Sequence, residues 1–283
     1  MELLSIQSSV AFGHVGNSAA IFPLQRLGIE AWAVNTVHFS NHTGYGEWRG
    51  PLLSAQDLRA VIQGVEERGA LANLAAVLSG YQGAEEVGAV ILDTVARVKE
   101  LNPSAVYCCD PVMGDVGRGM FVRPCIPEFM RDRVVPAADV ITPNHFELDF
   151  LCGRETHTVS DVLDAVDAVR AGGPSTVLVT SVLTEETPEG SVDVVAVSEG
   201  GAWSCRTPLL PINPNGCGDV TAAVFLAHLL RTGSAETALQ QVTSTVFGIL
   251  EKTIEAGTRE IQLVAAQDVI ADPPQRFEPT RLR

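Results

Sequence analysis

The chain has 283 residues, 46% of them hydrophobic, which is enough to bury a substantial core as one large α/β domain or as two small ones, and we expect one domain spanning residues 1–283. Its formal net charge of −15 argues against non-specific binding to nucleic acid or to an anionic membrane, because both attract lysine and arginine. The six cysteines lack metal-binding or redox spacing, and no basic leader or membrane-length apolar run is present, which predicts a cytoplasmic protein with reduced thiols.

The first part of the chain alternates strand-like and helix-like patterns. Residues 2–8 predict a strand with Ser8 at its carboxyl end, followed by a glycine-containing turn and a helix that runs toward Leu27. A second β-like run at 29–37 leads into a polar and aromatic loop that carries Asn41, His42, Thr43 and Tyr45. This composition suits recognition of a small polar ring, although asparagine, threonine and glycine are also common in ordinary turns.

The next segments bring an acidic residue to the end of a strand. Helical patterns at 55–68 and 85–101 flank a short strand that ends at Tyr81. An almost wholly apolar run, typical of a buried parallel strand, then delivers Asp110 at its carboxyl end, where open α/β sheets bind ligands. Residues 114–124 are rich in glycine and arginine and form either a mobile flap over the site or a long surface loop.

A second acidic residue is expected at the same edge. The run from 138 to 153 predicts a short strand, a Thr-Pro stop and a helix that begins near Asn144. Glu147 lies on the first turn of that helix and projects toward the edge that carries Asp110. The helix dipole alone favours an acidic residue there, so Glu147 by itself would indicate only a helix start.

The second half of the chain continues the alternation. A helix at 160–171 precedes a strand that ends in Thr180 and Ser181, whose hydroxyls can contact phosphate oxygens. A β-hairpin is predicted at 190–207. Two further helical patterns and a proline-containing surface tail are expected at 217–231, 235–254 and 272–283. No internal repeat and no domain linker is visible.

The stretch PNGCGD, residues 214–219, carries the strongest chemical signal. Gly216 and Gly218 permit a tight turn, and the apolar spacing after them predicts a helix. The unpaired N–H groups and the positive dipole end of that helix can hold an anion, with Asp219 beside it. A carboxylate next to an anion site suits phosphoryl transfer, in which it takes a proton from an attacking hydroxyl.

Other nucleotide-binding motifs are absent. The chain has no GxxxxGK[ST] sequence, no third glycine of a dinucleotide fingerprint and no protein-kinase catalytic loop. A lone GxGD is weak evidence, but its position after Asn213 and Asn215 and before a long apolar helix strengthens it. The strand and helix alternation favours an open, mainly parallel sheet covered on both faces.

Six motifs, in order between about residues 3 and 271, resemble the ribokinase-like family of ATP-dependent small-molecule kinases, and within it the pyridoxal kinases. They are IQSSVAFGHVGNSAA at 6–20, NTVHFSNHTGYG at 35–46, LSGY at 78–81, CDPVMGD at 109–115, TPNHFEL at 142–148 and GCGDVTAA at 216–223. The resemblance implies a ribokinase-like three-layer α/β/α fold with a central, mainly parallel sheet and a mobile flap. It also implies transfer of phosphate from ATP, with Mg²⁺, to the 5′-hydroxymethyl group of pyridoxal, pyridoxine or pyridoxamine in vitamin B6 salvage, by a homodimer.

The resemblance also assigns roles to individual residues. Asp219 would be the base for the hydroxymethyl group, and the backbone amides of Gly216, Cys217 and Gly218 would hold the transferring phosphate. The polar edge of the pyridine ring would be held by Ser8 and Thr43, with Gly44 beside it and Tyr81 near the ring. The nucleotide side would be lined by Asp110, Thr142, Asn144, Glu147, Thr180, Ser181, Asn213 and Asn215, with Asp110 and Glu147 facing magnesium through water.

Two departures and two alternatives accompany this resemblance. Thr180 stands where one subtype of bacterial pyridoxal kinase carries a lysine, so a hydroxyl replaces an ammonium contact to phosphate. Cys217 is interpreted as a small inward side chain rather than an activated thiolate.

The alternative functions are a kinase for a sugar or another heterocyclic alcohol, such as hydroxymethylpyrimidine, and a non-catalytic B6-vitamer-binding protein of the same fold.

Overall fold

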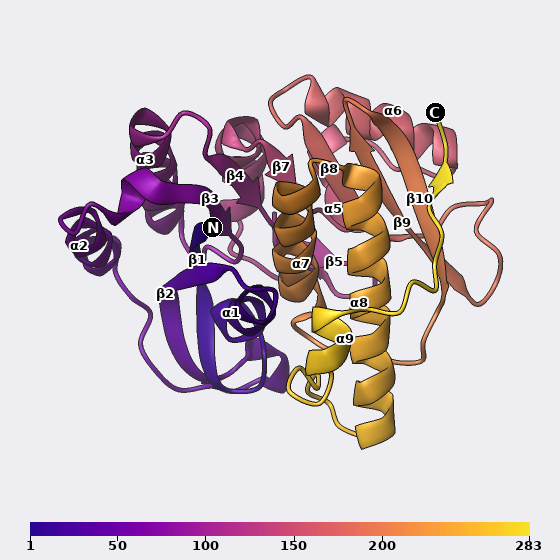
Figure 1. The fold of residues 1–283 in the computed structure, drawn as a ribbon, viewed down its shortest axis with the longest axis horizontal. Helices are drawn as coiled ribbons and strands as arrows, with labels where there is room; N and C mark the ends of the chain where they lie inside the picture. The colour runs from indigo at the N-terminus through magenta and orange to yellow at the C-terminus, as the bar shows by residue number, and fades with distance from the viewer.

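The computed structural model describes residues 1–283, and its centre is a twisted sheet of nine strands (Figure 1). These strands are β1 (Glu2–Phe12), β2 (Glu30–Asn41), β3 (Leu74–Ser79), β4 (Val106–Cys109), β7 (Val140–Ile141), β8 (Thr176–Val182), β9 (Ser191–Ser198), β10 (Gly201–Pro208) and β11 (Thr280–Arg281). Their order across the sheet is β11-β10-β9-β8-β7-β4-β3-β1-β2. The strands from β2 to β8 pair in parallel, and β9, β10 and β11 add antiparallel, which confirms a mainly parallel sheet.

Helices cover both faces of this sheet. One face carries α1 (Asn17–Arg26), α7 (Cys217–Thr232), α8 (Ala235–Ala256) and α9 (Gln267–Ala271), which lie toward the viewer in Figure 1. The other face carries α2 (Ala55–Glu66), α3 (Glu85–Leu101), α4 (Ile126–Phe129), α5 (His145–Cys152) and α6 (Val159–Arg170). None of the helices is both long enough and apolar enough to cross a membrane. The predicted three-layer α/β/α architecture is confirmed.

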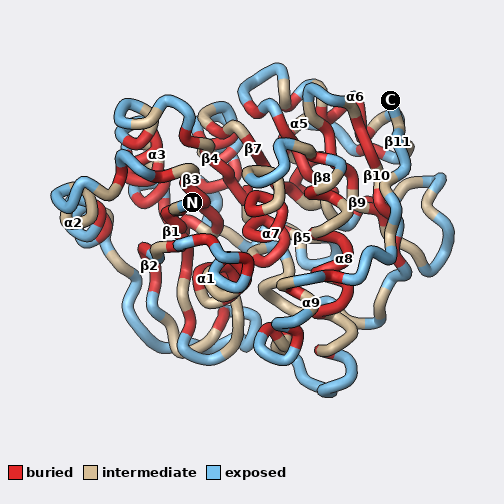
Figure 2. Tube along the Cα trace, viewed as in Figure 1, coloured by how far each residue is buried: buried red, intermediate tan, exposed pale blue.

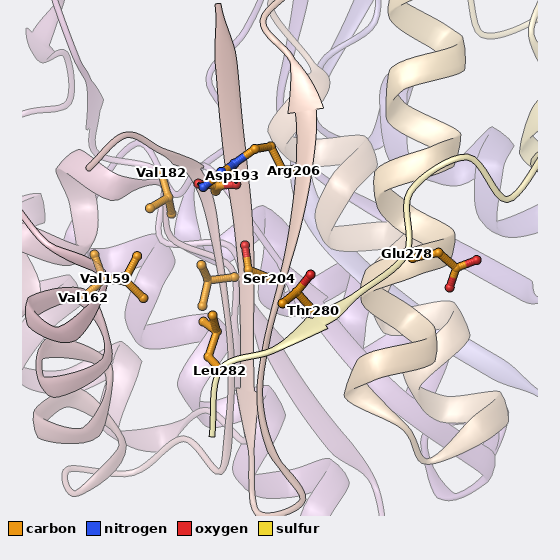
Figure 3. Close-up of a pocket in the computed structure, with 10 residues that line it drawn as sticks. Val159, Val162, Val182, Asp193, Ser204, Arg206, Glu278, Thr280 and Leu282 are labelled. Atoms are coloured by element: carbon orange, nitrogen blue, oxygen red, sulfur yellow. Dashed lines mark hydrogen bonds and ion pairs between the residues drawn. The ribbon is translucent and has the colours of Figure 1, made fainter. Parts of the chain in front are cut away.

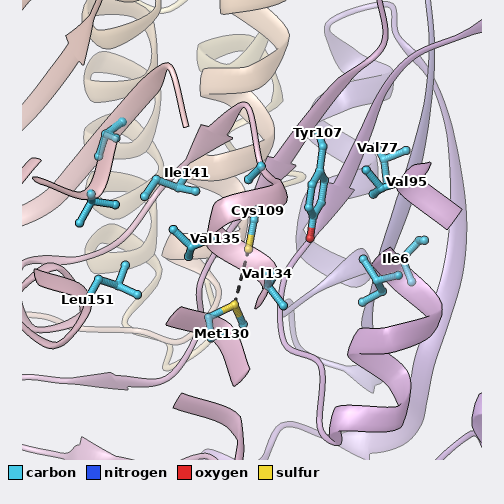
Figure 4. Packing of buried hydrophobic residues seen from close by; sticks show 14 of the residues in the cluster. Ile6, Val77, Val95, Tyr107, Cys109, Met130, Val134, Val135, Ile141 and Leu151 are labelled. Atoms are coloured by element: carbon cyan, nitrogen blue, oxygen red, sulfur yellow. Dashed lines mark hydrogen bonds between the residues drawn. The ribbon is translucent and has the colours of Figure 1, made fainter. Parts of the chain in front are cut away.

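Each face of the sheet has its own hydrophobic core, because parallel strands between two helical layers are buried on both sides. Burial is concentrated in the central strands and in the helix surfaces that face them (Figure 2). Figure 4 shows part of one core, where Tyr107 and Cys109 on β4 are fully buried and the Cys109 thiol donates to Met130 Sδ at 3.7 Å. The apolar run before Asp110 is therefore a central strand, as its composition predicts.

Local capping determines where several helices begin. Asn144 caps α5 by accepting the Glu147 N–H at 2.9 Å, and Glu147 Oε2 accepts the Asn144 N–H at 2.9 Å in return. This reciprocal capping box satisfies two amides that a helix start leaves unpaired. Gly153 ends the helix in the left-handed conformation, with φ 75°. The predicted helix start near Asn144 is confirmed.

Two predicted strand ends are too early. The first strand continues past Ser8 to Phe12, and the second continues past Val37 to Asn41. The two strands pair with each other as far as Phe12 and Asn41, whereas β3 pairs with β1 only up to Ile6. Ser8 therefore lies inside a strand, just beyond the point where the neighbouring strand stops, which still places it at the carboxyl edge of the sheet.

The last segment of the chain, residues 272–283, runs along the surface and ends on the sheet. Thr280 and Arg281 pair with β10 as its outer neighbour, and Phe277 packs edge-on against Phe247 of α8 with ring centroids 4.9 Å apart. Most of the segment is exposed. Strand pairing and one aromatic contact thus hold a segment whose local sequence shows no regular pattern.

Candidate active site

The anion turn is built by Gly216, which precedes the first residue of α7. Gly216 has φ 94°, and a Cβ at this position would overlap the carbonyl oxygen of His14. Only glycine fits both the backbone conformation and this close approach. The turn consequently leaves the amides of Cys217 and Gly218 in the unpaired first turn of a helix, where an anion can accept from them.

Asp219 is the third residue of α7 and stands next to this turn. Its side chain is half-buried, and burial raises its pKa to about 6, opposed by the backbone amides of Gly16 and of Asp219 itself. A carboxylate with a pKa near neutrality is a better base than an exposed one, because it binds a proton more readily while remaining largely ionised. The expected position of Asp219 beside the anion turn agrees with the structure.

Asp110 brings a second carboxylate to the same place. It is only 4% exposed, and its Oδ1 accepts a hydrogen bond from the Thr142 hydroxyl at 3.0 Å. Its Oδ2 lies 3.6 Å from where a Cβ of Gly218 would be. Burial raises the pKa of Asp110 well above its usual range, and the nearby charges of Glu147 and Asp219 raise it further. Three acidic residues therefore converge at the anion turn.

Glu147 is held differently from Asp110. Its Oε1 accepts the N–H of Met113 at 2.8 Å and that of Gly114 at 3.3 Å, in addition to the capping bond from Asn144 to Oε2. Burial raises its pKa to about 7, although these three amides oppose the shift. Both oxygens of Glu147 thus accept backbone amides. Through Met113 and Gly114, this carboxylate anchors the start of the segment that follows Asp110.

Thr180 and Ser181 lie near the carboxyl end of β8, the strand that pairs with β7. The Thr180 N–H donates to the Pro143 carbonyl at 3.0 Å, which brings Thr180 beside Asn144. Ser181 has φ 54° and is the only non-glycine residue with a positive φ. Such strained residues are enriched at binding sites. The structure therefore joins the predicted nucleotide residues Thr142, Asn144, Thr180 and Ser181 along one edge.

The predicted ring-binding residues lie on the other side of the anion turn. Ser8 packs against Gly16, where a Cβ would overlap the Ser8 carbonyl and hydroxyl, and Gly16 in turn neighbours Asp219. Thr43 is exposed in the short helix η1 (Thr43–Tyr45), and Gly44 packs against the Asn215 amide. Tyr81 follows β3, and burial raises its pKa, opposed by the charge of Arg123.

Asn213 and Asn215 point toward the segment after Asp110 rather than along the Thr180 edge. That segment forms a small hairpin, β5 (Gly114–Asp115) and β6 (Gly119–Met120). Asn213 Nδ2 donates to Asp115 Oδ2 at 3.3 Å, and Arg118 Nη1 donates to Asn215 Oδ1 at 2.9 Å. The hairpin therefore lies against the anion turn, and it exposes the apolar side chains of Val116, Met120 and Phe121.

The Cys217 side chain is not an activated thiolate. Burial raises its pKa to about 12, and the neighbouring charge of Asp219 adds to this. The thiol is therefore neutral near pH 7, despite its place at a helix N-terminus. Only the backbone amide of Cys217 is available to the anion turn, as the small-residue interpretation predicts.

Glu260, His42 and Arg118 lie beside the predicted site residues, although no sequence motif points to Glu260 or Arg118. His42 Nε2 lies 2.9 Å from Glu260 Oε1, and His42 Nδ1 lies 2.8 Å from Asn215 Nδ2. His42 stands within the loop whose polar and aromatic composition predicts ring binding, so the sequence did point to its surroundings. Glu260 follows α8 in a segment with no motif, and only the tertiary contact reveals it.

A separate cavity of about 320 Å³ lies away from these residues, between α6 and the strands β9 to β11 (Figure 3). Half of its lining is hydrophobic, and its polar part includes Arg206, whose guanidinium is paired with Asp193 at 2.8 Å. None of the predicted site residues lines it. The cavity is therefore separate from the predicted site at the anion turn.

No group of three or more histidine, cysteine, aspartate or glutamate side chains is arranged to hold a metal ion by itself. Asp110 Oδ2 faces Gly218, so it would be able to contact a hydrated ion at the anion turn, whereas Oδ1 accepts from Thr142. A helix N-terminus for an anion, a carboxylate of raised pKa and a second carboxylate at the carboxyl edge of the sheet together define an α/β small-molecule kinase.

Comparison with known proteins gives the particular family. Residues 71–264 match the family model described as phosphomethylpyrimidine kinase. The pyridoxal kinase PdxY of Rubrobacter xylanophilus is 59% identical over 283 residues, which are 100% of this chain and 98% of that protein. The pyridoxal kinase PdxY of Leifsonia xyli is 57% identical over 282 residues, covering 100% of both chains.

Solved structures agree with these relatives. The pyridoxal kinase of Leishmania donovani in complex with ADP and pyridoxine superposes with a TM-score of 0.91 at 30% identity, covering 100% of this chain and 99% of the other. The pyridoxal kinase of Entamoeba histolytica superposes with a TM-score of 0.89 at 26% identity and covers 99% of both chains. The chain belongs to the pyridoxal kinase family.

Proposed function

We propose that the chain transfers the γ-phosphate of ATP to the 5′-hydroxymethyl group of pyridoxal, giving pyridoxal 5′-phosphate in vitamin B6 salvage. The observation that carries this proposal is the position of Asp219, whose carboxylate of raised pKa stands in the same helical turn as the anion-binding amides. Membership of the family supports it, as does the solved L. donovani pyridoxal kinase, which was obtained with ADP together with pyridoxamine or pyridoxine.

In the proposed reaction Asp219 takes the proton of the substrate hydroxyl as its oxygen bonds to the γ-phosphorus. The bond between that phosphorus and the bridging oxygen breaks, and ADP leaves with the electron pair. The amides of Gly216, Cys217 and Gly218 donate to the phosphoryl oxygens, where negative charge is concentrated during transfer. The burial that raises the pKa of Asp219 therefore serves the proton transfer.

Magnesium fits the nucleotide side of this site. Asp110 would hold the hydrated ion through its Oδ2, while Glu147, whose oxygens already accept backbone amides, would contribute negative charge behind it. The ion, when bound with ATP, would neutralise phosphate charge. Because the protein offers no three-ligand cage, the metal is expected to bind together with the nucleotide.

The remaining residues are assigned by the part of the site they occupy. Ser8, Thr43, Gly44 and Tyr81 hold the pyridine ring, and the hairpin β5–β6 is the flap that covers the reacting groups. The nucleotide is held by Thr142, Asn144, Thr180 and Ser181, with Asn213 and Asn215 connecting the nucleotide side to the flap. The hydrogen bonds from Asn213 and to Asn215 support this last role.

A second candidate acceptor is hydroxymethylpyrimidine, because the matching family model is described as phosphomethylpyrimidine kinase. This ring also carries a hydroxymethyl group and would use the same base and anion turn. The relatives named pyridoxal kinase that match over the full chain favour pyridoxal instead.

A coupled assay of ADP release with purified protein tests the proposal. We expect the highest kcat/KM with pyridoxal among pyridoxal, pyridoxine, pyridoxamine, hydroxymethylpyrimidine and ribose. A preference for hydroxymethylpyrimidine would replace pyridoxal as the substrate. The absence of ADP release with every acceptor, together with measurable pyridoxal binding, would indicate a non-catalytic vitamer-binding protein.

We also propose a single kinase domain that acts as a cytoplasmic homodimer. All six cysteines are free thiols, which suits a reducing compartment. The homodimer rests on the family resemblance. Light scattering after size-exclusion chromatography tests it, and a mass of one chain at micromolar concentration would contradict it.

A further inference from the structure

Glu260, in the segment between α8 and α9, contacts two parts of the chain that are far from it in sequence, the turn after β1 and the loop after β2. Its Oε1 accepts the Tyr45 hydroxyl at 2.7 Å and lies 2.9 Å from His42 Nε2, while its Oε2 accepts the His14 N–H at 3.2 Å. The Glu260 side chain is 12% exposed. A Cβ on Gly13 would overlap its carboxylate, so the turn after β1 is shaped around this group.

The hydrogen bonds of Asn215 determine the tautomer of His42. Asn215 Oδ1 accepts from Arg118 Nη1 at 2.9 Å, so its amide nitrogen must face His42 Nδ1, 2.8 Å away. An amide nitrogen can only donate, so His42 Nδ1 is the acceptor and the proton of the neutral ring lies on Nε2. That proton is donated to Glu260. One arrangement of donors and acceptors therefore satisfies the contacts that join Arg118, Asn215, His42 and Glu260.

The chain of contacts leads from a buried pair to the exposed hairpin. His42 is 6% exposed, whereas Arg118 lies on the exposed tip between β5 and β6. Asn215, which connects them, directly precedes Gly216 of the anion turn. Gly44 has no room for a Cβ because the Asn215 amide packs against it. The orientation of the Asn215 amide is thus coupled to the loop that carries His42 and Gly44, to the anion turn and to the hairpin.

We propose that His42 and Glu260 are positioning residues that orient the Asn215 amide, so that Asn215 holds Arg118 of the hairpin against the anion turn. This inference rests on the proposed function, because it assigns the hairpin to the same phosphoryl-transfer site. The pair acts through Asn215 and touches no reacting group. Burial alone would raise the pKa of Glu260, but hydrogen bonds from Tyr45 and His42 outweigh it and hold the pKa below its usual range.

A double-mutant cycle between His42 and Arg118 tests the coupling, because these two side chains are joined only through Asn215. We expect His42→Phe and Arg118→Ala each to lower kcat about 10-fold, with KM for ATP changing far less, since alignment is lost rather than binding. The double variant should lose no more than the worse single variant. Multiplying losses, about 100-fold together, would overturn the proposal.

Glu260→Ala should lower kcat as much as His42→Phe does, because it removes the acceptor that holds the His42 ring. The matched control is Glu255→Ala, since Glu255 precedes Glu260 in sequence, lies at the exposed end of α8 and pairs only with Lys252 at 2.7 Å. It should retain normal kcat. Equal losses in Glu260→Ala and Glu255→Ala would also overturn the proposal.

Hydrogen exchange of residues 114–121 in the ligand-free protein gives a readout that does not depend on activity. We expect about 10-fold faster exchange there in His42→Phe, Asn215→Ala and Arg118→Ala, and no change in Glu255→Ala. If His42→Phe does not fold, Glu260→Ala replaces it in the cycle with Arg118→Ala. Faster exchange in the variants together with a wild-type protein that has no kinase activity would refute the proposed function alone. Unchanged exchange in the variants of an active wild-type protein would refute this inference alone.

Discussion

The carboxylate of Asp110 faces the backbone of Gly218 across the active site, with Oδ2 3.6 Å from where a Cβ of Gly218 would be. This contact joins β4 to the start of α7, two elements that are distant in sequence. It brings the acidic edge next to the anion turn, where the charge of Asp219 adds to burial and to the charge of Glu147 in raising the pKa of Asp110. The proposed chemistry leads to five predictions.

Replacing Asp219 by Asn should lower kcat by roughly 10²- to 10⁴-fold, the usual range for loss of a general base. The asparagine side chain has nearly the same shape, so KM should change much less. Circular dichroism and thermal unfolding serve as controls for the fold. Turnover near that of the wild type would remove Asp219 from the mechanism.

The same substitution should stabilise the protein at alkaline pH. Because the pKa of Asp219 is raised to about 6 in the native state, its ionised form destabilises the fold, and stability is lost as pH rises toward and through that value. Asp219→Asn should therefore be more stable than the wild type by about 1–2 kcal/mol at pH 8, after allowance for partial exposure. The difference should shrink at pH 5. Urea unfolding at both pH values measures it, and a destabilised variant at pH 8 would contradict the assignment.

The acid limb of the activity profile should report Asp219. As a base it must be ionised, so kcat/KM for pyridoxal should fall below a pKa of about 6, by roughly 10-fold per pH unit, because kcat/KM reports the free protein. A kcat/KM that stays constant down to pH 5 would show that no group of raised pKa limits the reaction.

Gly216→Ala should damage the site far more than Gly233→Ala. Both glycines have a positive φ at the two ends of α7, 94° and 66°, so each substitution carries a backbone cost of about 1–2 kcal/mol. A Cβ at Gly233 meets nothing within 4 Å, whereas one at Gly216 would overlap the His14 carbonyl. We expect kcat to fall roughly 10²-fold for Gly216→Ala only, as for loss of oxyanion donors. Equal kcat values in the two variants would show that the turn is not used.

Removal of magnesium should abolish turnover reversibly. Because the chain has no three-ligand metal cage, EDTA should stop activity at once and added Mg²⁺ should restore it. Calorimetry should show Mg²⁺ binding in the presence of ATP and little without it. Asp110→Asn should raise the Mg²⁺ concentration needed for half-maximal activity. An unchanged requirement would exclude Asp110 from the metal edge.

The sequence identified the parts of the site that depend on local chemistry. The start of α7, with Gly216, Gly218 and Asp219, could be predicted because a glycine turn and the apolar periodicity of one helix are written in consecutive residues. The alternation of strands and helices predicted the layers for the same reason. Strand ends were less predictable, since β1 continues past Ser8 only because β2 pairs with it.

The sequence by itself thus predicted the turn before α7, the proposed base and the strands that lead to Asp110 and Thr180. Only the tertiary structure decided how these groups are held. It assigned Glu147 to the amides at the base of the hairpin, and it brought Glu260 to His42 across 218 residues of chain. Local patterns encode helices and turns, whereas the partner of a buried carboxylate is chosen by the packing of distant segments, and no residue next to Glu260 records that choice.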